Sequence, residues 1–308
     1  MSDIELVIAV EGKSARSGSL SSELLPVTQQ SWWEQHVEYS KFNRQGLDIF
    51  TASFVRADAK ANVVFVTGWS ECFLKYADLI RKLFDAGFNV YTYDHQSQGL
   101  SGRWLAEHQS TWVGHFEDYV DDFVYFVTHL QRGEDGRRPF YSIAHSMGGL
   151  ITAQAMTKHP QLINKAAFSA PMFRNKCAMK ALRYRGPLPV PLAWWIISFA
   201  CFMGLGKMHA LGFFIEDPND PINVELTTDK EQLGNWERLR RRYPRIISSC
   251  VTNNWSMEVL KATEAFSQQY SQMKTPSIVF KATEDIFVYN HAMDLFAEQA
   301  LSAKYDFK

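Results

Sequence analysis

The sequence predicts an α/β fold in which helices cover both faces of a mostly parallel sheet. Two observations support this prediction. Short apolar segments rich in β-branched residues alternate with longer segments whose apolar residues recur at helical spacing. One short segment, residues 62–67 (NVVFVT), is apolar along almost its whole length, as expected of a strand buried on both faces. With 308 residues, 46% of them hydrophobic and 21% charged, the chain can bury a large core.

The expected elements follow one another at lengths typical of βαβ units. In the helix over residues 71–86, Leu74, Ala77 and Ile80 recur at helical spacing, and Gly87 follows as a C-cap. We expect further helices over residues 116–130, 147–158 and 290–301, and strands over residues 48–55, 62–67, 89–93, 139–144, 165–169, 277–282 and 304–308.

The alternation stops between residues 172 and 274, where prolines, tryptophans and helical patches replace buried strands. We therefore predict a helical cap, or lid, inserted at residues 172–274 into an α/β core formed by residues 35–171 and 275–308. Residues 1–34 are predicted to form an N-terminal arm. Ligands of open parallel sheets bind at the carboxyl ends of the strands, so the chemistry is expected there.

Composition argues against several function classes. Lys and Arg total 32 and Asp and Glu total 33, a net charge of -1 that argues against a nucleic-acid-binding protein. The four cysteines show no metal-ligand or disulfide spacing, so we expect no metal and a reducing compartment. No glycine-rich loop follows the first strand, which argues against a nucleotide-binding Rossmann domain.

Two segments bear on localisation. Asp3 and Glu5 lie where a signal peptide carries positive charge, and the apolar run over residues 6–10 is short, so we expect no signal peptide and a cytoplasmic protein. Residues 188–206 carry no charge over 19 positions, which is long enough for a membrane span. Prolines near one end and glycines near the other favour a buried or interfacial segment instead.

The strongest local signal is the segment 140–149 (FYSIAHSMGG), in which Ser146 lies between a predicted strand and a predicted helix. The small residues Ala144 and Gly148, two positions either side, allow the sharp turn known as a nucleophile elbow. Such a turn raises the serine hydroxyl above the sheet, and the helix N-terminus favours the negative charge that develops in acyl transfer. Ser146 is therefore the candidate nucleophile. The alternative is a glycine turn that only packs the helix on the strand.

A second candidate element is the segment 67–71 (TGWSE), which follows an earlier strand. An oxyanion hole needs two backbone N–H donors, one from the residue after the nucleophile and one from such a loop. Met147 and Trp69 are the candidates for these two donors. The alternative is an ordinary βα turn in which Gly68 supplies the bend.

Five short segments form a further, ordered pattern: 76–79 (YADL), 94–103 (DHQSQGLSGR), 118–122 (DYVDD), 144–149 (AHSMGG) and 169–172 (SAPM). Together they resemble the α/β-hydrolase superfamily, and within it the group of lysophospholipases and monoacylglycerol lipases, above all the bacterial inner-membrane lysophospholipases. The resemblance extends from about residue 35 to the end of the sequence. It departs from the family pattern at Gln96-Ser97, where the family has Arg-Gly, and at Thr67-Gly68, where it has His-Gly.

The resemblance implies a catalytic triad in the order serine, acid, histidine, with the acid after a late strand. Asp285, in the segment 282–288 (ATEDIFV), falls on the family's acid position, and Glu284 beside it is a weaker rival. The alternative is a carboxylate that only caps a helix or lies in a solvated loop.

No histidine of the chain fits the base of this triad. Only His291 of the nine histidines follows Asp285, and it begins a predicted helix. His145 adjoins the nucleophile but should point away from the exposed face of the turn. We therefore expect no catalytic histidine within these residues and a C-terminal end truncated relative to the family, as a fragment or a degenerate product.

The predicted cap combines basic and apolar residues. The basic residues, with no acidic one among residues 172–185, are Arg174, Lys176, Lys180, Arg183 and Arg185. The apolar residues that follow are Leu192, Trp194, Trp195, Ile196, Ile197, Phe199, Phe202 and Met203. This pairing suits an anionic lipid surface and a pocket for one acyl chain, and a solvated basic face beside a cap core is an equal alternative.

These observations and the resemblance predict a serine carboxylic-ester hydrolase that acts on monoacyl lipids through an acyl-enzyme. A lysophospholipase is the first choice, with a lysophospholipid or a monoacylglycerol as substrate and no cofactor. The alternatives are a monoacylglycerol lipase or general esterase, and a catalytically inert lipid-binding homologue, which the absent histidine favours. We also expect the cap to make peripheral contact with the cytoplasmic face of the inner membrane.

Overall fold

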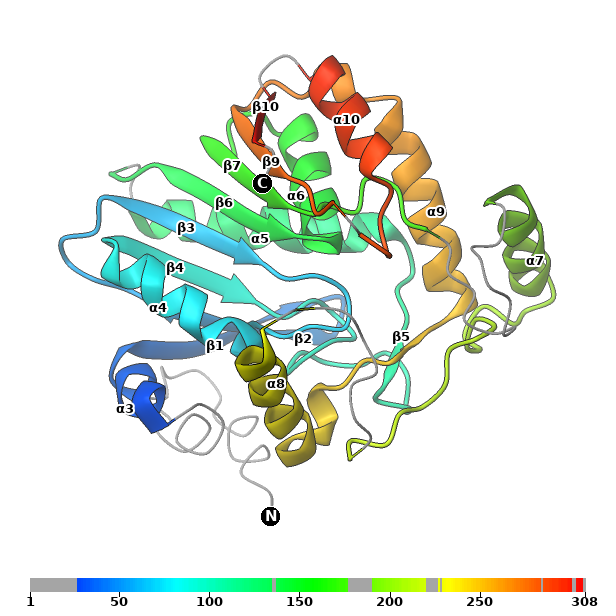
Figure 1. The fold of residues 1–308 in the computed structure, drawn as a ribbon, viewed down its shortest axis with the longest axis horizontal. Coiled ribbons are helices and arrows are strands. Elements are labelled where there is room, and N and C mark those ends of the chain that lie inside the picture. The colour runs from blue at the N-terminus through cyan, green and yellow to red at the C-terminus, as the bar shows by residue number, and fades with distance from the viewer. Residues whose placement is uncertain are drawn as a thin grey trace.

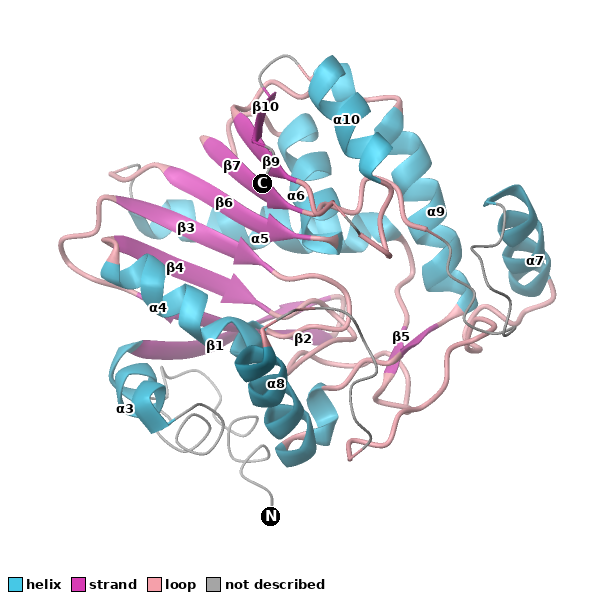
Figure 2. Ribbon diagram, viewed as in Figure 1, coloured by secondary structure: helices cyan, strands magenta, loops and turns pink. Residues whose placement is uncertain are grey.

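The computed structural model describes residues 27–134, 137–176, 190–219, 227, 229–283, 285–300 and 303–306 (Figure 1). Its centre is a sheet of eight strands in the order β1-β2-β4-β3-β6-β7-β9-β10. The pairs β1–β2 and β2–β4 are antiparallel, and all other neighbouring strands are parallel (Figure 2). The predicted α/β class with a mostly parallel sheet is thereby confirmed.

The strands of this sheet are β1 (Val37–Arg44), β2 (Leu47–Phe54), β3 (Ala61–Val66), β4 (Phe88–Tyr93), β6 (Phe140–His145), β7 (Lys165–Ser169), β9 (Ser277–Phe280) and β10 (Ala303–Asp306). The helices are α3 (Val27–His36), α4 (Ala77–Asp85), α5 (Phe116–Glu134), α6 (Met147–Lys158), α7 (Val190–Phe202), α8 (Lys230–Arg242), α9 (Asn253–Ser267) and α10 (Asn290–Gln299). The short 3₁₀ helices are η1 (Phe73–Tyr76), η2 (Pro244–Ile246) and η3 (Tyr270–Gln272). α6 and β7 have the predicted bounds, whereas the sequence pattern predicts neither α3 nor β1.

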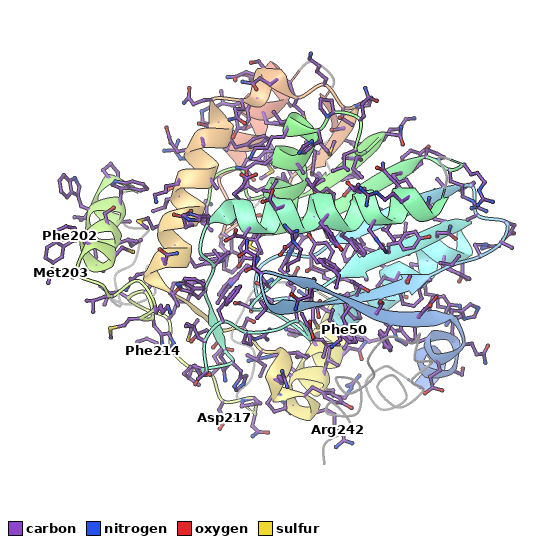
Figure 3. The ribbon with its side chains drawn as sticks, turned by 180° about the vertical axis from the view of Figure 1, so that it is seen from behind. Phe50, Phe202, Met203, Phe214, Asp217 and Arg242 are labelled. Atoms are coloured by element: carbon purple, nitrogen blue, oxygen red, sulfur yellow. The ribbon has the colours of Figure 1, made fainter. Side chains whose placement is uncertain are left out.

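Helices cover both faces of the sheet, with α4 on one face and α5 and α6 on the other (Figures 1 and 3). Every residue of β3 is buried, and its successive side chains pack into two different core clusters. Val64 and Val66 join the cluster that includes α5 and α6, whereas Phe65 joins the cluster that includes η1 and α4. Successive side chains of a strand point to opposite faces, so a central strand with both faces covered is apolar along almost its whole length.

The start of the described chain packs firmly on the core. Trp33 of α3 is fully buried, stacks on Phe73 and meets the edge of Phe54, and its indole N–H donates to the Tyr39 hydroxyl at 2.7 Å. Residues 27–34 of the expected N-terminal arm therefore belong to a docked helix. The remainder of that arm, residues 1–26, lies outside the described residues.

The expected cap contains α7, α8 and β8 (Cys250–Val251), which pairs in parallel with β5 (Ser110–Thr111) of the core. α9, which the sequence places in the cap, packs on both α7 and α5 and contributes Trp255, Val259 and Phe266 to the main core cluster. The bounds of the cap, residues 172–274, stay a prediction.

α7 is the apolar helix of the cap, and most of its surface is uncovered. Ala193 and Ile197 are buried, but Trp195 is 74% exposed and Phe202 85% exposed. In Figure 3, Phe202 and Met203 lie at the outer edge of the molecule, away from the sheet. No helix among the described residues is long and apolar enough to cross a membrane. With 13 residues, α7 extends only about 20 Å, against a hydrocarbon core of about 30 Å.

Candidate active site

Ser146 lies at the junction that the sequence predicts for a nucleophile. β6 ends at the preceding residue and α6 begins at the following one. The backbone of Ser146 has φ 50° and ψ −116°, a left-handed conformation that is unfavourable for a residue with a side chain. Four backbone hydrogen bonds hold it there: its N–H donates to Ser169 O, and its carbonyl accepts from Gly149 N, Leu150 N and Met172 N.

Two glycines of α6 permit the tight approach of this helix to the sheet. A Cβ on Gly148 would lie 2.5 Å from the carbonyl oxygen of Thr67, and a Cβ on Gly149 would lie 2.6 Å from the Pro171 side chain. The space at Gly148 is bounded by the backbone of the chain leaving β3, which cannot move without disturbing the sheet. A side chain at either position would clash, which explains why the sequence motif has glycine at both.

The loop after β3 lies directly beside the nucleophile. A Cβ on Gly68 would be 3.1 Å from Ser146 Cβ. Among the described residues, no acceptor receives a hydrogen bond from the backbone N–H of Trp69 or of Met147. The two predicted oxyanion donors are thus free amides next to Ser146, which favours their assignment, although that assignment stays a prediction.

The side chain of Trp69 forms part of an aromatic wall between loop, cap and core. Its indole N–H donates to Thr111 Oγ1 at 3.0 Å. Its ring meets Phe213 of the cap edge-on at a centroid distance of 5.9 Å and Trp255 of α9 at 5.6 Å. This wall beside the candidate nucleophile is chemically suited to an apolar ligand.

Glu71 is a buried acid that the sequence analysis did not single out. Its Oε2 accepts from Gly68 N at 2.7 Å, and its Oε1 accepts from Lys75 Nζ at 2.5 Å. Burial alone would raise the pKa of the Glu71 carboxyl, but the charges of Lys75 and His145 outweigh it and lower that pKa to about 2. Glu71 is therefore ionised at neutral pH. A Glu one helical turn before a Lys was the available signal in the sequence.

The segment after β4 contacts the loop that follows β3, which carries Gly68 and Glu71. Asp94 is fully buried and accepts from Phe73 N at 2.9 Å and Leu100 N at 2.8 Å. Burial raises the pKa of Asp94 to about 7, although both hydrogen bonds act in the opposite direction. Burial also lowers the pKa of His95 to about 4, so this histidine is neutral at pH 7, with its Nε2 2.9 Å from Thr67 O.

The departure from the family pattern at Gln96 has a structural counterpart. Gln96 Nε2 donates to Asp122 Oδ2 at 2.8 Å, and Arg44 Nε donates to the other oxygen at 3.1 Å. Arg44 comes from β1, 78 residues earlier in the chain. A cation from a distant strand therefore balances this buried acid, and only the tertiary structure shows that pairing.

Asp285, the candidate acid, lies in the turn that follows β9. Its Oδ1 accepts from the N–H groups of Phe287 and Val288 at 2.7 and 2.9 Å, which caps that turn. Lys176, at the entry to the cap, donates to the Asp285 carbonyl oxygen. No histidine of the described chain bonds to Asp285, so its triad role stays a prediction. Glu284 lies outside the described residues.

All nine histidines lie within the described residues, and none hydrogen-bonds to Ser146. His145 Nδ1 lies 3.0 Å from Ser169 O, on the neighbouring strand, in agreement with a structural role. His291 belongs to the first turn of α10. The structure thus brings Ser146, Met147 and Trp69 together but supplies no base beside them.

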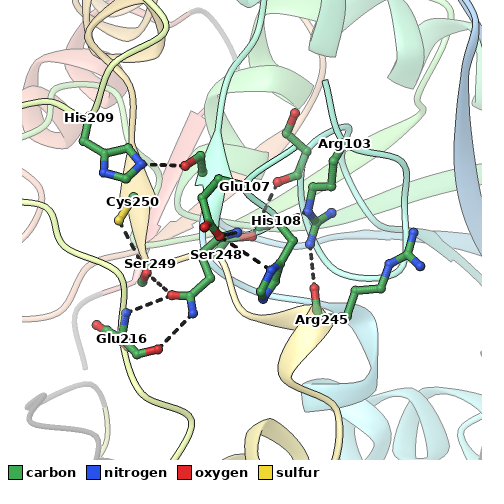
Figure 4. Close-up of polar contacts among 12 residues, drawn as sticks. Arg103, Glu107, His108, His209, Glu216, Arg245, Ser248, Ser249 and Cys250 are labelled. Carbon is green, nitrogen blue, oxygen red and sulfur yellow. Dashed lines mark hydrogen bonds and ion pairs between the residues drawn. The ribbon is translucent and has the colours of Figure 1, made fainter. Parts of the chain in front are cut away.

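A polar network that sequence reasoning missed ties the cap to the core (Figure 4). His209 Nε2 lies 2.6 Å from the hydroxyl of Ser110, and the side chain of Gln109 bonds to both the N–H and the carbonyl of Glu216. Ser249 also donates to Gln109 Oε1. These partners lie about a hundred residues or more apart, so no local pattern signals them.

Comparison with known proteins places this site in a family. Residues 57–308 match the family model Hydrolase_4, described as serine aminopeptidase, S33. The chain is 33% identical over 276 residues to lysophospholipase L2 of Escherichia coli, covering 88% of this chain and 77% of that protein. It is 25% identical over 243 residues to a probable lysophospholipase L2 of Haemophilus influenzae, covering 75% and 70%.

Solved structures agree on the fold. A soluble variant of monoglyceride lipase from Saccharomyces cerevisiae has a TM-score of 0.66 at 16% identity, covering 89% of this chain and 85% of that one. A carboxyl esterase from Bacillus coagulans has a TM-score of 0.67 at 13% identity, covering 88% and 89%. The chain therefore has the α/β-hydrolase fold and belongs to the Hydrolase_4 family.

Proposed function

We propose that this protein is a serine carboxylic-ester hydrolase of monoacyl lipids, foremost a lysophospholipase. The observation that carries the proposal is the left-handed Ser146 at the turn from β6 to α6, with the loop of Gly68 and Trp69 against it. Strained backbone of this kind persists where the surrounding structure holds it, and it is characteristic of functional sites. The names of the bacterial relatives support a lysophospholipid as substrate.

The reaction proceeds by acyl transfer. The Ser146 oxygen bonds to the acyl carbon while its proton passes to a base, and the Met147 and Trp69 amides stabilise the oxyanion. The intermediate collapses, and the head group leaves with the proton. Water then attacks the acyl-enzyme and releases the fatty acid. Asp285 orients the base in this scheme, and no metal or cofactor takes part.

The apolar surface of the cap supports contact with a membrane, which is where such substrates reside. Exposed aromatic side chains of α7 lie beyond Arg174 and Lys176, and the other three basic residues of the predicted cluster lie outside the described residues. Aromatic and basic side chains together suit the surface of an anionic bilayer. We therefore propose peripheral binding through the cap.

A second candidate function is that of an inert lipid-binding protein with the same fold. The observation that favours it is the absence of a hydrogen bond between Ser146 and any of the nine histidines. Without a base the serine hydroxyl stays protonated and is a poor nucleophile. Loss of one triad member leaves an acceleration of only about 10³–10⁴-fold over water.

Labelling with a fluorophosphonate separates the two functions. The hydrolase is expected to react covalently at Ser146, as located by peptide mapping, and to lose the label in Ser146→Ala. Added imidazole, which can act as an external base, is expected to accelerate both labelling and hydrolysis of lysophospholipid. Labelling that persists in Ser146→Ala, or no labelling even with imidazole, would overturn the proposal.

A further inference from the structure

Three successive backbone amides follow β3 beside the candidate nucleophile, those of Gly68, Trp69 and Ser70. The first donates to Glu71 Oε2 at 2.7 Å, and the third donates to Gln98 Oε1 at 2.9 Å. Only the Trp69 amide between them meets no acceptor within the described part of the chain. The loop therefore offers one free donor between two that side chains occupy.

Glu71 is suited to hold this loop because it is buried and its charge is balanced. It is 7% exposed, and its second oxygen accepts from Lys75 Nζ at 2.5 Å. An unpaired carboxylate here would oppose an oxyanion developing nearby, and the ammonium group offsets that effect. Lys75 also lies over the ring of Trp236 of α8, 5.8 Å from its centroid, which limits its movement.

Gln98 holds the same loop from the segment after β4. Its side chain is fully buried, and its Nε2 donates to Gly68 O at 3.4 Å while its Oε1 accepts from Ser70. Its own backbone N–H donates to His95 O at 3.0 Å. One amide side chain thus contacts the peptide group that carries the free Trp69 N–H, through Gly68 O, and the next peptide group, through Ser70 N–H.

We propose that Glu71 and Gln98 are positioning residues that orient the loop so that the Trp69 N–H meets the developing oxyanion. This inference rests on the proposed function. Without the acceptor on Glu71, the Gly68 N–H is buried and unpaired, which is unfavourable and promotes rotation of the adjoining peptide. The Met147 amide needs no such support, because α6 orients it.

The test measures fluorophosphonate labelling in the presence of imidazole and separates the reversible binding constant from the maximal labelling rate. Glu71→Gln keeps the size of the side chain but leaves one acceptor oxygen for two donors, Gly68 N–H and Lys75 Nζ. Gln98→Met removes both the acceptor for Ser70 N–H and the donor to Gly68 O. Glu258→Gln is the matched control, because Glu258 is also 7% exposed and also pairs with a backbone N–H and a lysine.

Loss of one oxyanion donor slows catalysis about 10²–10³-fold, so a misdirected donor is expected to slow maximal labelling by about 10- to 100-fold. This is expected for Glu71→Gln and Gln98→Met, with the binding constant almost unchanged. Glu258→Gln is expected to label at close to the original rate. If Glu71→Gln does not fold, Gln98→Met decides the question.

Three outcomes refute the inference, and they are distinguishable. If the unmodified chain is not labelled at Ser146, the proposed function fails and the inference with it. If the unmodified chain is labelled and the folded Glu71→Gln and Gln98→Met label equally fast, only the positioning roles fail. A change confined to the binding constant also refutes them, because an oxyanion donor acts on the rate.

Discussion

Tryptophan and phenylalanine side chains are buried in one region of the molecule and exposed to solvent in another. Trp33 and Phe73, at the junction of α3, η1 and the sheet, are completely buried, whereas Trp195 and Phe202 of α7 are 74% and 85% exposed. The first region has two packed surfaces that meet, whereas no described residue covers most of the apolar surface of the second. Aromatic content therefore says nothing about burial until the opposing surface is known.

The largest expected effect separates these regions by stability. Phe73→Ala removes a ring packed against Trp33 and is expected to lower the free energy of unfolding by about 3–5 kcal/mol. Phe202→Ala is expected to change it by no more than about 0.5 kcal/mol. Urea unfolding of both variants checks this. Equal losses would show that α7 is packed in solution.

The tight turn at the nucleophile should be almost as sensitive. Gly148→Ala places a Cβ 2.5 Å from the carbonyl oxygen of Thr67, the residue that follows β3. We therefore expect the free energy of unfolding to fall by about 1–3 kcal/mol and the labelling of Ser146 to weaken. Gly133→Ala, in α5 with open space around it, is the control and should gain about 0.5–1 kcal/mol. Thermal unfolding measures the stability of both variants. A stability of Gly148→Ala equal to that of the original chain would contradict the steric argument.

The exposed aromatic surface should matter for membrane binding instead of stability. Combined Trp195→Ser, Phe199→Ser and Phe202→Ser substitutions are expected to weaken binding to anionic vesicles at least about tenfold, because they remove apolar contact area. Neutralising the five basic residues of the predicted cluster should remove only the part of binding that salt weakens, since surface charge is screened within about 10 Å at 0.1 M.

Vesicle sedimentation at low and high salt distinguishes the two contributions. Neutral vesicles provide the control, because they should retain the aromatic contribution alone. Undiminished binding by both variants would exclude α7 and its basic approach as the contact surface.

The last expected effect concerns a charge buried in the core. The pKa of Asp94 rises from 3.8 to about 7 on folding, so the folded chain binds more protons than the unfolded chain between these values. The contribution of Asp94 to stability is thus full below pH 3.8 and is lost as the pH rises toward 7. Asp94→Asn lacks this titration, so the unfolding free energy of the original chain minus that of Asp94→Asn should fall across this window.

Denaturant unfolding of both chains at several pH values between about 4 and 7 tests whether this difference in unfolding free energy falls as the pH rises. Other titrating groups, such as His95, are common to both chains and cancel in the difference. A difference that stays level or rises with pH would contradict the raised pKa.

Sequence periodicity predicted the elements near the site well because it is a local property. The bounds of α6 and β7 agree with the prediction, and Ser146 falls at the expected turn. The same method missed α3 and β1, whose polar outer residues blur the pattern. Its assignment of α9 to the cap stays a prediction, because a helix that packs on the core and one that lies above it can have the same apolar stripe.

The sequence by itself determined the alternation of strands and helices, the nucleophile turn and the glycines that permit it. Each of these depends on residues within a few positions of one another, through hydrophobic period or steric space. The tertiary structure decided which amide beside Ser146 is free, which cation balances Asp122 and which aromatic residues of the cap stay uncovered. Those outcomes depend on partners such as Gln98 for Ser70 and Arg44 for Asp122, which lie 28 and 78 residues away along the chain and become neighbours only when the crossovers of the sheet are formed.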